Sequence, residues 1–165
     1  MSKRNENLIK FSNWLAPNQS KFEMILSAIA AIALIMKMQH IQSMNFLLTI
    51  SLSTLAVLFY ISSFATPPED FTIMDLFANK LLHWGSAIAI IGILFTIQNW
   101  KGSVQMIVAG SGALLIGIVI SFMKSESRLS ITKPTLILLL ALALLFTPKE
   151  KLIKPIHSAQ NYHSN

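Results

Sequence analysis

The sequence predicts an all-α integral membrane protein, built as a tandem repeat of a two-helix transmembrane hairpin (four spans) with a short fifth apolar helix. Hydrophobic residues make up 53% of the chain and charged residues 12%, whereas about a quarter of the residues in a soluble domain are charged. No Asp, Glu, Lys or Arg occurs in residues 38–68, 81–100 or 102–123, and about 18 apolar residues can cross a bilayer as a helix. A soluble helical core would show a polar stripe on each helix, which these segments lack.

A repeat within the chain defines the hairpin as the unit of the fold. Ser27-Ala28-Ile29-Ala30 recurs as Ser86-Ala87-Ile88-Ala89, and Gln39 recurs as Gln98 at the same spacing. The predicted domains are a basic cytoplasmic leader, two transmembrane hairpin repeats, a loop with the fifth span, and a disordered tail. They cover residues 1–21, 22–80, 81–124, 125–148 and 149–165, respectively.

The leader carries Leu8, Phe11, Trp14 and Leu15 at roughly helical spacing. This pattern fits an amphipathic helix on the membrane surface, and equally a frayed tail with scattered apolar residues. No small-x-small cleavage site follows the first apolar run, so we expect that run to be retained as a signal anchor.

The first span is predicted over Glu23–Met38 and is short, so Glu23 and Lys37 should reach toward opposite interfaces. The second covers Phe46–Phe64 and is followed by a Pro67-Pro68-Glu69-Asp70 turn, because neither proline continues a helix. The third and fourth spans are predicted over Leu81–Ile97 and Val104–Met123. The acids of the connector before Lys80 are expected to form a solvated loop rather than a cation site.

The last apolar stretch, Thr135–Thr147, lies between Pro134 and Pro148 and reaches about 20 Å as a helix. Its many leucines favour insertion, whereas the distribution of Lys and Arg favours a cytoplasmic tail under the positive-inside rule. We predict a fifth span and leave open the side on which the chain ends.

In the fourth span, small residues repeat every four positions at Ala109, Ala113 and Gly117, with Gly110 and Gly112 beside them. Such residues let two helix backbones approach closely in lipid. The stripe therefore predicts a helix-packing or partner-binding surface. Its partner could be the first or third span, or another subunit.

Lys37, Gln39 and His40 end the first span. A proton relay or a contact with an acidic partner is one interpretation, and an ordinary interfacial loop is the interpretation we favour. No HExxH motif, phosphate-binding glycine loop or nucleophile elbow occurs. We therefore predict no enzyme, catalytic residue, metal site or cofactor. The basic residues flank apolar segments, as topology determinants do, so nucleic acid is not an expected partner.

Three short stretches of the sequence together resemble the conserved motifs of one membrane-protein family. Residues 34–43 read L-I-M-K-M-Q-H-I-Q-S and residues 94–103 read L-F-T-I-Q-N-W-K-G-S. Both resemble the L-F-K-I-Q-H-W-P-G-A turn between the two spans of the GldL family, the inner-membrane subunit of the gliding-motility and type IX secretion motor. Ile61-Ser62-Ser63-Phe64, leading to Pro67-Pro68-Glu69-Asp70, resembles the family's I-S-A-F-E-P-P-H-E-D. The likeness covers residues 24–72 well and 83–122 more loosely.

This resemblance implies a GldL-like membrane fold with Lys37 and His40 on the periplasmic side. In that family a glutamate in a G-L-L-T-E-A stretch of the second span couples proton-motive force to rotation. Here the aligned residues are Ser51-Leu52-Ser53-Thr54-Leu55-Ala56, and the second copy has Leu114 at the same place. The resemblance therefore does not extend to the motor function.

The predicted function is that of a multi-pass bacterial inner-membrane protein, GldL-like but non-motor, with a cytoplasmic N-terminus. It would act in the lipid bilayer through helix packing or by binding a membrane partner, as a homo-oligomer or with another membrane protein. The alternative is a small transporter or channel built from two parallel hairpin repeats.

Overall fold

Helices account for nearly all of the described chain in a computed structural model, which describes residues 3–39, 43–67, 69, 71–123 and 132–146. Within these residues there is no β-strand, as the all-α prediction requires. His40, the predicted loop at 125–131 and the predicted tail at 149–165 lie outside the described residues. The helices are α1 (Lys3–Leu15), the 3-10 turn η1 (Ala16–Asn18), α2 (Gln19–Met38), α3 (Met44–Ser62), α4 (Ile73–Ile97), α5 (Ser103–Met123) and α6 (Thr132–Phe146).

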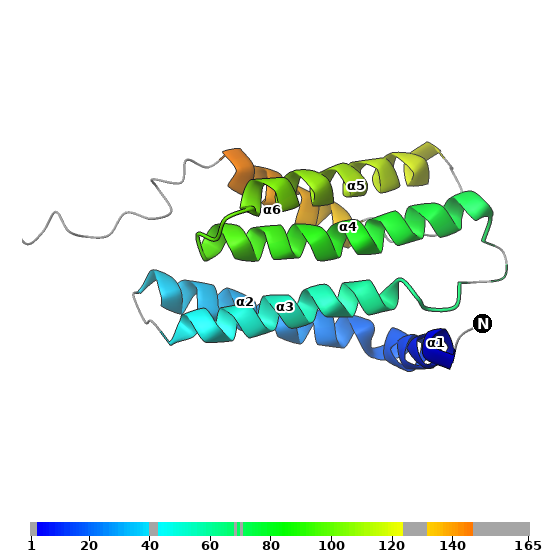
Figure 1. Cartoon of the computed structure of the whole chain (residues 1–165), viewed down its shortest axis with the longest axis horizontal. Helices are drawn as coiled ribbons and strands as arrows, with labels where there is room; N and C mark the ends of the chain where they lie inside the picture. The colour runs from blue at the N-terminus through cyan, green and yellow to red at the C-terminus, as the bar shows by residue number, and fades with distance from the viewer. Residues whose placement is uncertain (1–2, 40–42, 68, 70, 124–131, 147–165) are drawn as a thin grey trace, which may run out of the picture.

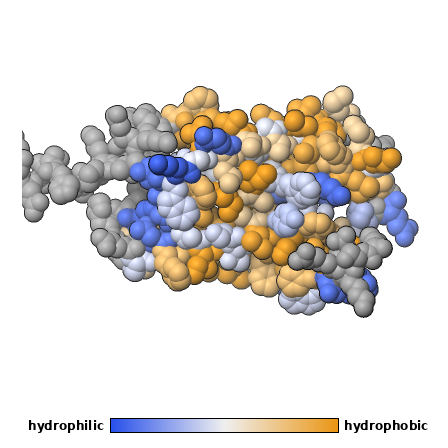
Figure 2. Space-filling view, in the orientation of Figure 1, coloured by the Kyte–Doolittle hydropathy of each residue, from blue (hydrophilic) through white to orange (hydrophobic). Residues whose placement is uncertain are grey.

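Two antiparallel hairpins, α2–α3 and α4–α5, lie side by side, with α3 against α4 (Figure 1). The shorter α6 packs on α4 and α5. Hydrophobic side chains cover most of the visible surface, and hydrophilic ones gather mainly toward the two ends (Figure 2). Among the described residues, four helical stretches are long and apolar enough to cross a membrane: Glu6–Lys37, Met44–Ser62, Ile73–Ile97 and Ser103–Met123. The chain is thus a multi-pass membrane protein with a shorter apolar fifth helix.

The third span begins earlier than the sequence suggested, at Ile73 instead of Leu81. Thr72 and Asp75 form a capping box at this end. The Asp75 carboxylate accepts from the Thr72 backbone N–H at 2.9 Å, and the Thr72 hydroxyl accepts from the Asp75 backbone N–H at 3.4 Å. Reciprocal capping satisfies the first free N–H groups of a helix, so Asp75 belongs to the helix start and not to a loop.

Glycines set the close approach of α4 and α5, the two helices of the second hairpin. Gly85 and Gly92 of α4 face Leu114 and Ile107 of α5. In return, Gly110 and Gly117 of α5 face Ala89 and Leu82 of α4. Each helix therefore presents glycines to residues of the other, so the two backbones can come close together. In lipid, the hydrophobic effect does not drive helices to associate, and close packing of this kind does.

The two hairpins bury residues at equivalent positions of the repeat. Leu48 and Ile107 are equivalent, as are Ser62 and Ser121, and all four are buried. Ser62 donates to the Leu58 carbonyl at 2.8 Å and Ser121 donates to the Gly117 carbonyl at 2.8 Å. Leu58 stands where Gly117 stands in the second copy, so the first hairpin has no glycine at that place.

The leader contributes a helix, α1, docked on the end of α3. Ser12 donates to the Ile61 carbonyl at 2.9 Å, and the Asn13 side chain exchanges two 2.8 Å hydrogen bonds with Thr66. Phe11 and Trp14 are exposed and stack on each other, with ring centroids 5.8 Å apart. The leader is thus helical over residues 3–15, as one of its two interpretations predicted, and is not a frayed tail there.

Candidate functional site

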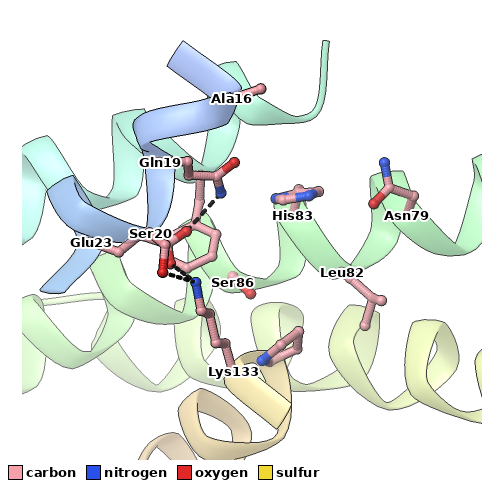
Figure 3. A pocket seen from close by; sticks show the side chains of 11 residues that line it. Ala16, Gln19, Ser20, Glu23, Asn79, Leu82, His83, Ser86 and Lys133 are labelled. Atoms are coloured by element: carbon pink, nitrogen blue, oxygen red, sulfur yellow. Dashed lines mark hydrogen bonds and ion pairs between the residues drawn. The ribbon is translucent and has the colours of Figure 1, made fainter. Parts of the chain in front are cut away.

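A polar pocket lies where α2, α4 and α6 meet, next to the end of α3 (Figure 3). Glu23, one turn into α2, is buried with 6% of its surface exposed. Lys133, at the start of α6, forms an ion pair with it, and the Lys133 side chain is 49% exposed. The pair therefore joins a buried carboxylate to a cation that is half exposed.

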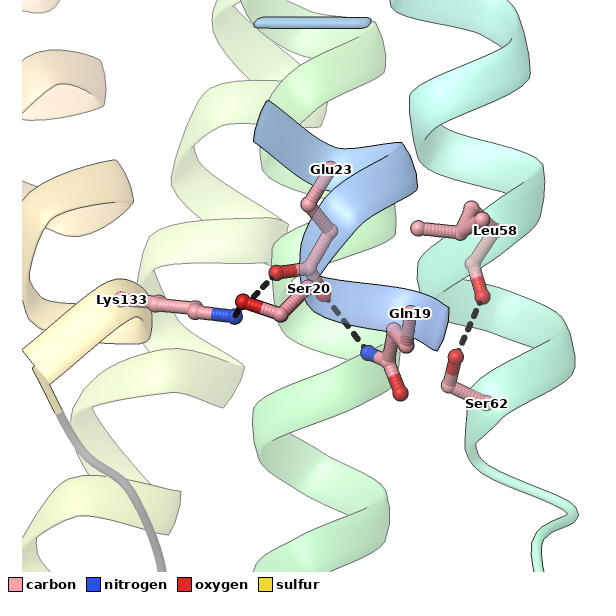
Figure 4. Close-up of polar contacts among 6 residues, drawn as sticks. All are labelled: Gln19, Ser20, Glu23, Leu58, Ser62 and Lys133. Carbon is pink, nitrogen blue, oxygen red and sulfur yellow. Dashed lines mark hydrogen bonds and ion pairs between the residues drawn. The ribbon is translucent and has the colours of Figure 1, made fainter. Parts of the chain in front are cut away.

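Two further side chains of α2 complete the surroundings of the ion pair (Figure 4). Gln19 donates to the Glu23 carboxylate at 2.7 Å, and Lys133 donates to the Ser20 hydroxyl at 3.3 Å. Glu23 is therefore held inside the bundle by its partners and does not extend into solvent. A carboxylate at the end of a membrane helix is stabilised by an opposite charge within reach, and α6 brings Lys133 to that place.

The pocket has a volume of about 280 Å³ and contains two buried polar atoms without a hydrogen-bond partner among the described residues. These are Nδ1 of His83 and Oγ of Ser86, both on α4. Ser86 is fully buried. An unpaired buried polar group costs about 1–3 kcal/mol, so a ligand with hydrogen-bonding groups would be stabilised here.

The opposite end of the bundle carries a second polar cluster, which ties the two hairpins together. Lys37 donates to the Ile97 carbonyl at 2.8 Å and to the Gln98 side chain at 3.0 Å. Gln98 donates in turn to the Asn45 carbonyl at 3.1 Å and to the Thr49 hydroxyl at 3.0 Å. A cation at the carboxyl end of α4 also complements the helix dipole. Of the other two residues singled out there, Gln39 is exposed and His40 lies outside the described residues.

The small residues of α5 do not share one contact face. Gly110 and Gly117 pack on α4, the predicted third span. Ala113 is half-buried, Ala109 is exposed, and nothing lies within 4 Å of where a Cβ on Gly112 would be. The two glycines of α5 that contact α4 are seven residues apart, because antiparallel helices in close contact meet along a seam with a seven-residue repeat. Ala109 and Gly112 therefore remain on the outward side of α5.

Sequence reasoning missed Glu23, Lys133 and Ser86 as members of one site. A signal was present, since Glu23 begins one apolar run and Lys133 directly precedes another. Charged groups within membrane segments usually pair with one another. An ion pair between Glu23 and Lys133 could therefore have been predicted. Among the described residues, no group of three or more His, Cys, Asp or Glu is placed to hold a metal ion.

Comparison with known proteins gives a match for the first hairpin. Residues 25–79 match the family model described as the GldL N-terminal domain. The matched segment covers α2 from Ile25, all of α3 and the start of α4. Glu23, His83, Ser86 and Lys133 lie outside it. No curated protein and no solved structure matched the chain.

Proposed function

We propose that this membrane protein is a non-motor relative of GldL, because residues 25–79 of its first hairpin match the GldL N-terminal domain. It would bind a partner within the bacterial inner membrane and have no catalytic role. The proposal depends on the residue that aligns with the glutamate that couples proton-motive force to rotation in the GldL family. The resemblance predicts a coupling glutamate there, and this chain has Leu55 in the first hairpin and Leu114 in the second.

Both leucines belong to the packed interior. Leu55 is 7% exposed and lies in a cluster with Phe59 and Ile90, and Leu114 is fully buried against Gly85. A carboxylate at either place would be desolvated among apolar side chains, which is costly without a charged partner. The burial of these positions supports a packing role for the second helix of each hairpin.

A partner surface is supported on the outward side of α5. Ala109 is exposed and Gly112 has open space where a Cβ would be. Small residues let another helix come close enough for extensive contact. The exposed apolar residues around them would contact either lipid or that helix.

Cysteine cross-linking in native membranes tests the proposal, since the chain has no native cysteine. Ala109→Cys should give a cross-linked product with a second copy or another membrane protein. Leu115→Cys, also exposed but about 120° around the same helix, is the matched control. If Ala109→Cys yields no more product than Leu115→Cys, the partner surface is wrong.

The proposal places the leader in the cytoplasm and Lys37 on the periplasmic side. The basic residues of the leader support this orientation under the positive-inside rule. A membrane-impermeant thiol reagent applied to spheroplasts should label Gln39→Cys, which lies at an exposed position. If Gln39→Cys were labelled only after the membrane is broken, this end of the bundle would lie in the cytoplasm and the proposed orientation would be wrong.

The transporter alternative finds less support. Between Ser86 and Gln98, the buried residues of α4 are Ala87, Ala89, Ile90, Gly92, Ile93 and Leu94. This apolar layer separates the polar pocket from the cluster at Lys37. In liposomes, we expect no proton or solute flux above that of empty vesicles, and a measured flux would favour the alternative.

A further inference from the structure

A second cavity continues from the polar pocket. It has a volume of about 460 Å³ and runs between α2 and α6, over α3 and α4. Ser20, Glu23, Phe59 and Lys133 line both cavities. One end of the combined space is therefore polar and charged, while the remainder is almost entirely apolar.

The apolar part runs lengthwise along the bundle. From the charged end, its lining extends to Leu34 on α2, to Ile97 on α4 and to Leu140 on α6. Glu23 and Leu34 are separated by about 16 Å along α2. That length is close to the depth of one leaflet, about half of a 30 Å hydrocarbon core.

The charges at the junction have opposite signs. Glu23 offers a carboxylate, and Lys133 offers an ammonium that donates to Glu23 and Ser20 among the residues that the structure describes. An ammonium group has three donors, so one remains for a ligand. The buried Ser86 hydroxyl, without a partner among the described residues, lines the same end.

We propose that the two cavities form one site for a phospholipid with a primary ammonium headgroup. The headgroup ammonium pairs with Glu23, the phosphate pairs with Lys133 and reaches the Ser86 hydroxyl, and one acyl chain fills the apolar groove. A primary ammonium can donate to the carboxylate, which a quaternary one cannot. A helix is about 10 Å across and would leave the polar end unmatched, so the space favours an acyl chain.

Native mass spectrometry in mild detergent tests the site with two probes, dipalmitoyl phosphatidylethanolamine and dipalmitoyl phosphatidylglycerol. The wild-type chain should bind one phosphatidylethanolamine, with an affinity about tenfold higher than for phosphatidylglycerol. This is the difference expected when one charge-assisted contact is gained. Equal binding of the two lipids would overturn the headgroup assignment.

A matched pair of substitutions on α2 tests the groove. Ala31 lines it and Ala28 does not, and both are exposed. Ala31→Phe should fill the groove and lower occupancy by both lipids, whereas Ala28→Phe should leave occupancy unchanged. Retained binding in Ala31→Phe would overturn the proposal.

Two further substitutions test the polar end. Glu23→Gln, which removes the carboxylate, should abolish the preference between the two lipids, and Ser86→Ala, which leaves the ion pair intact, should lower the occupancy of both. An unchanged occupancy in Ser86→Ala would exclude that hydroxyl from the site even if Glu23→Gln fails to fold. A disulfide between two chains carrying Ala31→Cys would identify a second copy as the occupant and overturn the lipid assignment.

Discussion

Glu23 of α2 and Lys133 of α6 form an ion pair between residues 110 apart in the sequence. Through this contact α6, which packs on the second hairpin, also holds the first. The two partners differ in exposure, since Glu23 is buried and Lys133 is about half exposed. Removing one partner should therefore have a different effect from removing the other.

We expect Lys133→Met to cost about 3 kcal/mol of unfolding free energy, because it leaves a buried carboxylate without its cation. Glu23→Gln should cost less, about 1 kcal/mol, since the freed ammonium can reach solvent. The double variant should recover part of the loss caused by Lys133→Met. Unfolding in mixed detergent micelles, followed by circular dichroism, measures all three.

A control for this prediction is the ion pair between Glu6 and Lys10 of α1, at 2.8 Å with both side chains largely exposed. Exposed pairs of this kind contribute little to stability. Lys10→Met should leave the melting temperature unchanged. An equal loss in Lys10→Met and Lys133→Met would show that burial does not govern the effect.

The membrane spans and hairpins could be predicted from the sequence because uncharged runs of sufficient length have few other stable states. The predicted second and fourth spans lie within about two residues of α3 and α5. The start of α4 was misplaced because its first turns carry Asp75 and Lys80. Their charges masked a helix that the Thr72 cap begins.

The polar pocket could not be predicted in the same way. Its two charged residues come from opposite ends of the chain, so their meeting depends on how α6 packs. Local periodicity carries no information about that packing. The contact face of α5 was ambiguous for a related reason, because Ala109 and Gly110 are neighbours that point about 100° apart. Gly85 and Gly92 on α4, with the same spacing as Gly110 and Gly117, could have identified the contacting face.

Gly110→Ala should destabilise the second hairpin. The added Cβ would lie 2.5 Å from the backbone nitrogen of Ala89, so the helices must separate. Overpacking of this kind costs about 1–3 kcal/mol. Gly112→Ala, with open space at the Cβ position, is the matched control and should be neutral or slightly stabilising. Thermal unfolding in detergent compares the two, and equal melting temperatures would contradict the packing of α4 on α5.

Gln98→Ala should loosen the end of the bundle where the hairpins meet. The Gln98 side chain accepts from Lys37 and donates to Asn45 and Thr49, so its loss breaks three contacts between helices. We expect faster amide hydrogen exchange at the start of α3 and the end of α4. Gln39→Ala, at the equivalent exposed position of the first hairpin, should not change exchange there. Similar exchange in both variants would mean that Gln98 does not tie the hairpins.

Trp14 should lie at the level of the lipid headgroups. It is exposed beside Phe11 on a helix whose other side is docked on α3 through Ser12, so its indole is free to enter the interface. Amphipathic helices of this kind insert their apolar side chains to a shallow depth. In a variant with Trp84→Phe and Trp100→Phe, brominated lipids with bromine near the carbonyls should quench Trp14 more strongly than lipids brominated at the chain ends. A variant that keeps Trp84 alone controls for protein-dependent quenching. If aqueous acrylamide quenched Trp14 as strongly as it quenches free tryptophan, α1 would lie in water. Its docking on α3 would then stabilise the helical bundle without any contact between α1 and the bilayer.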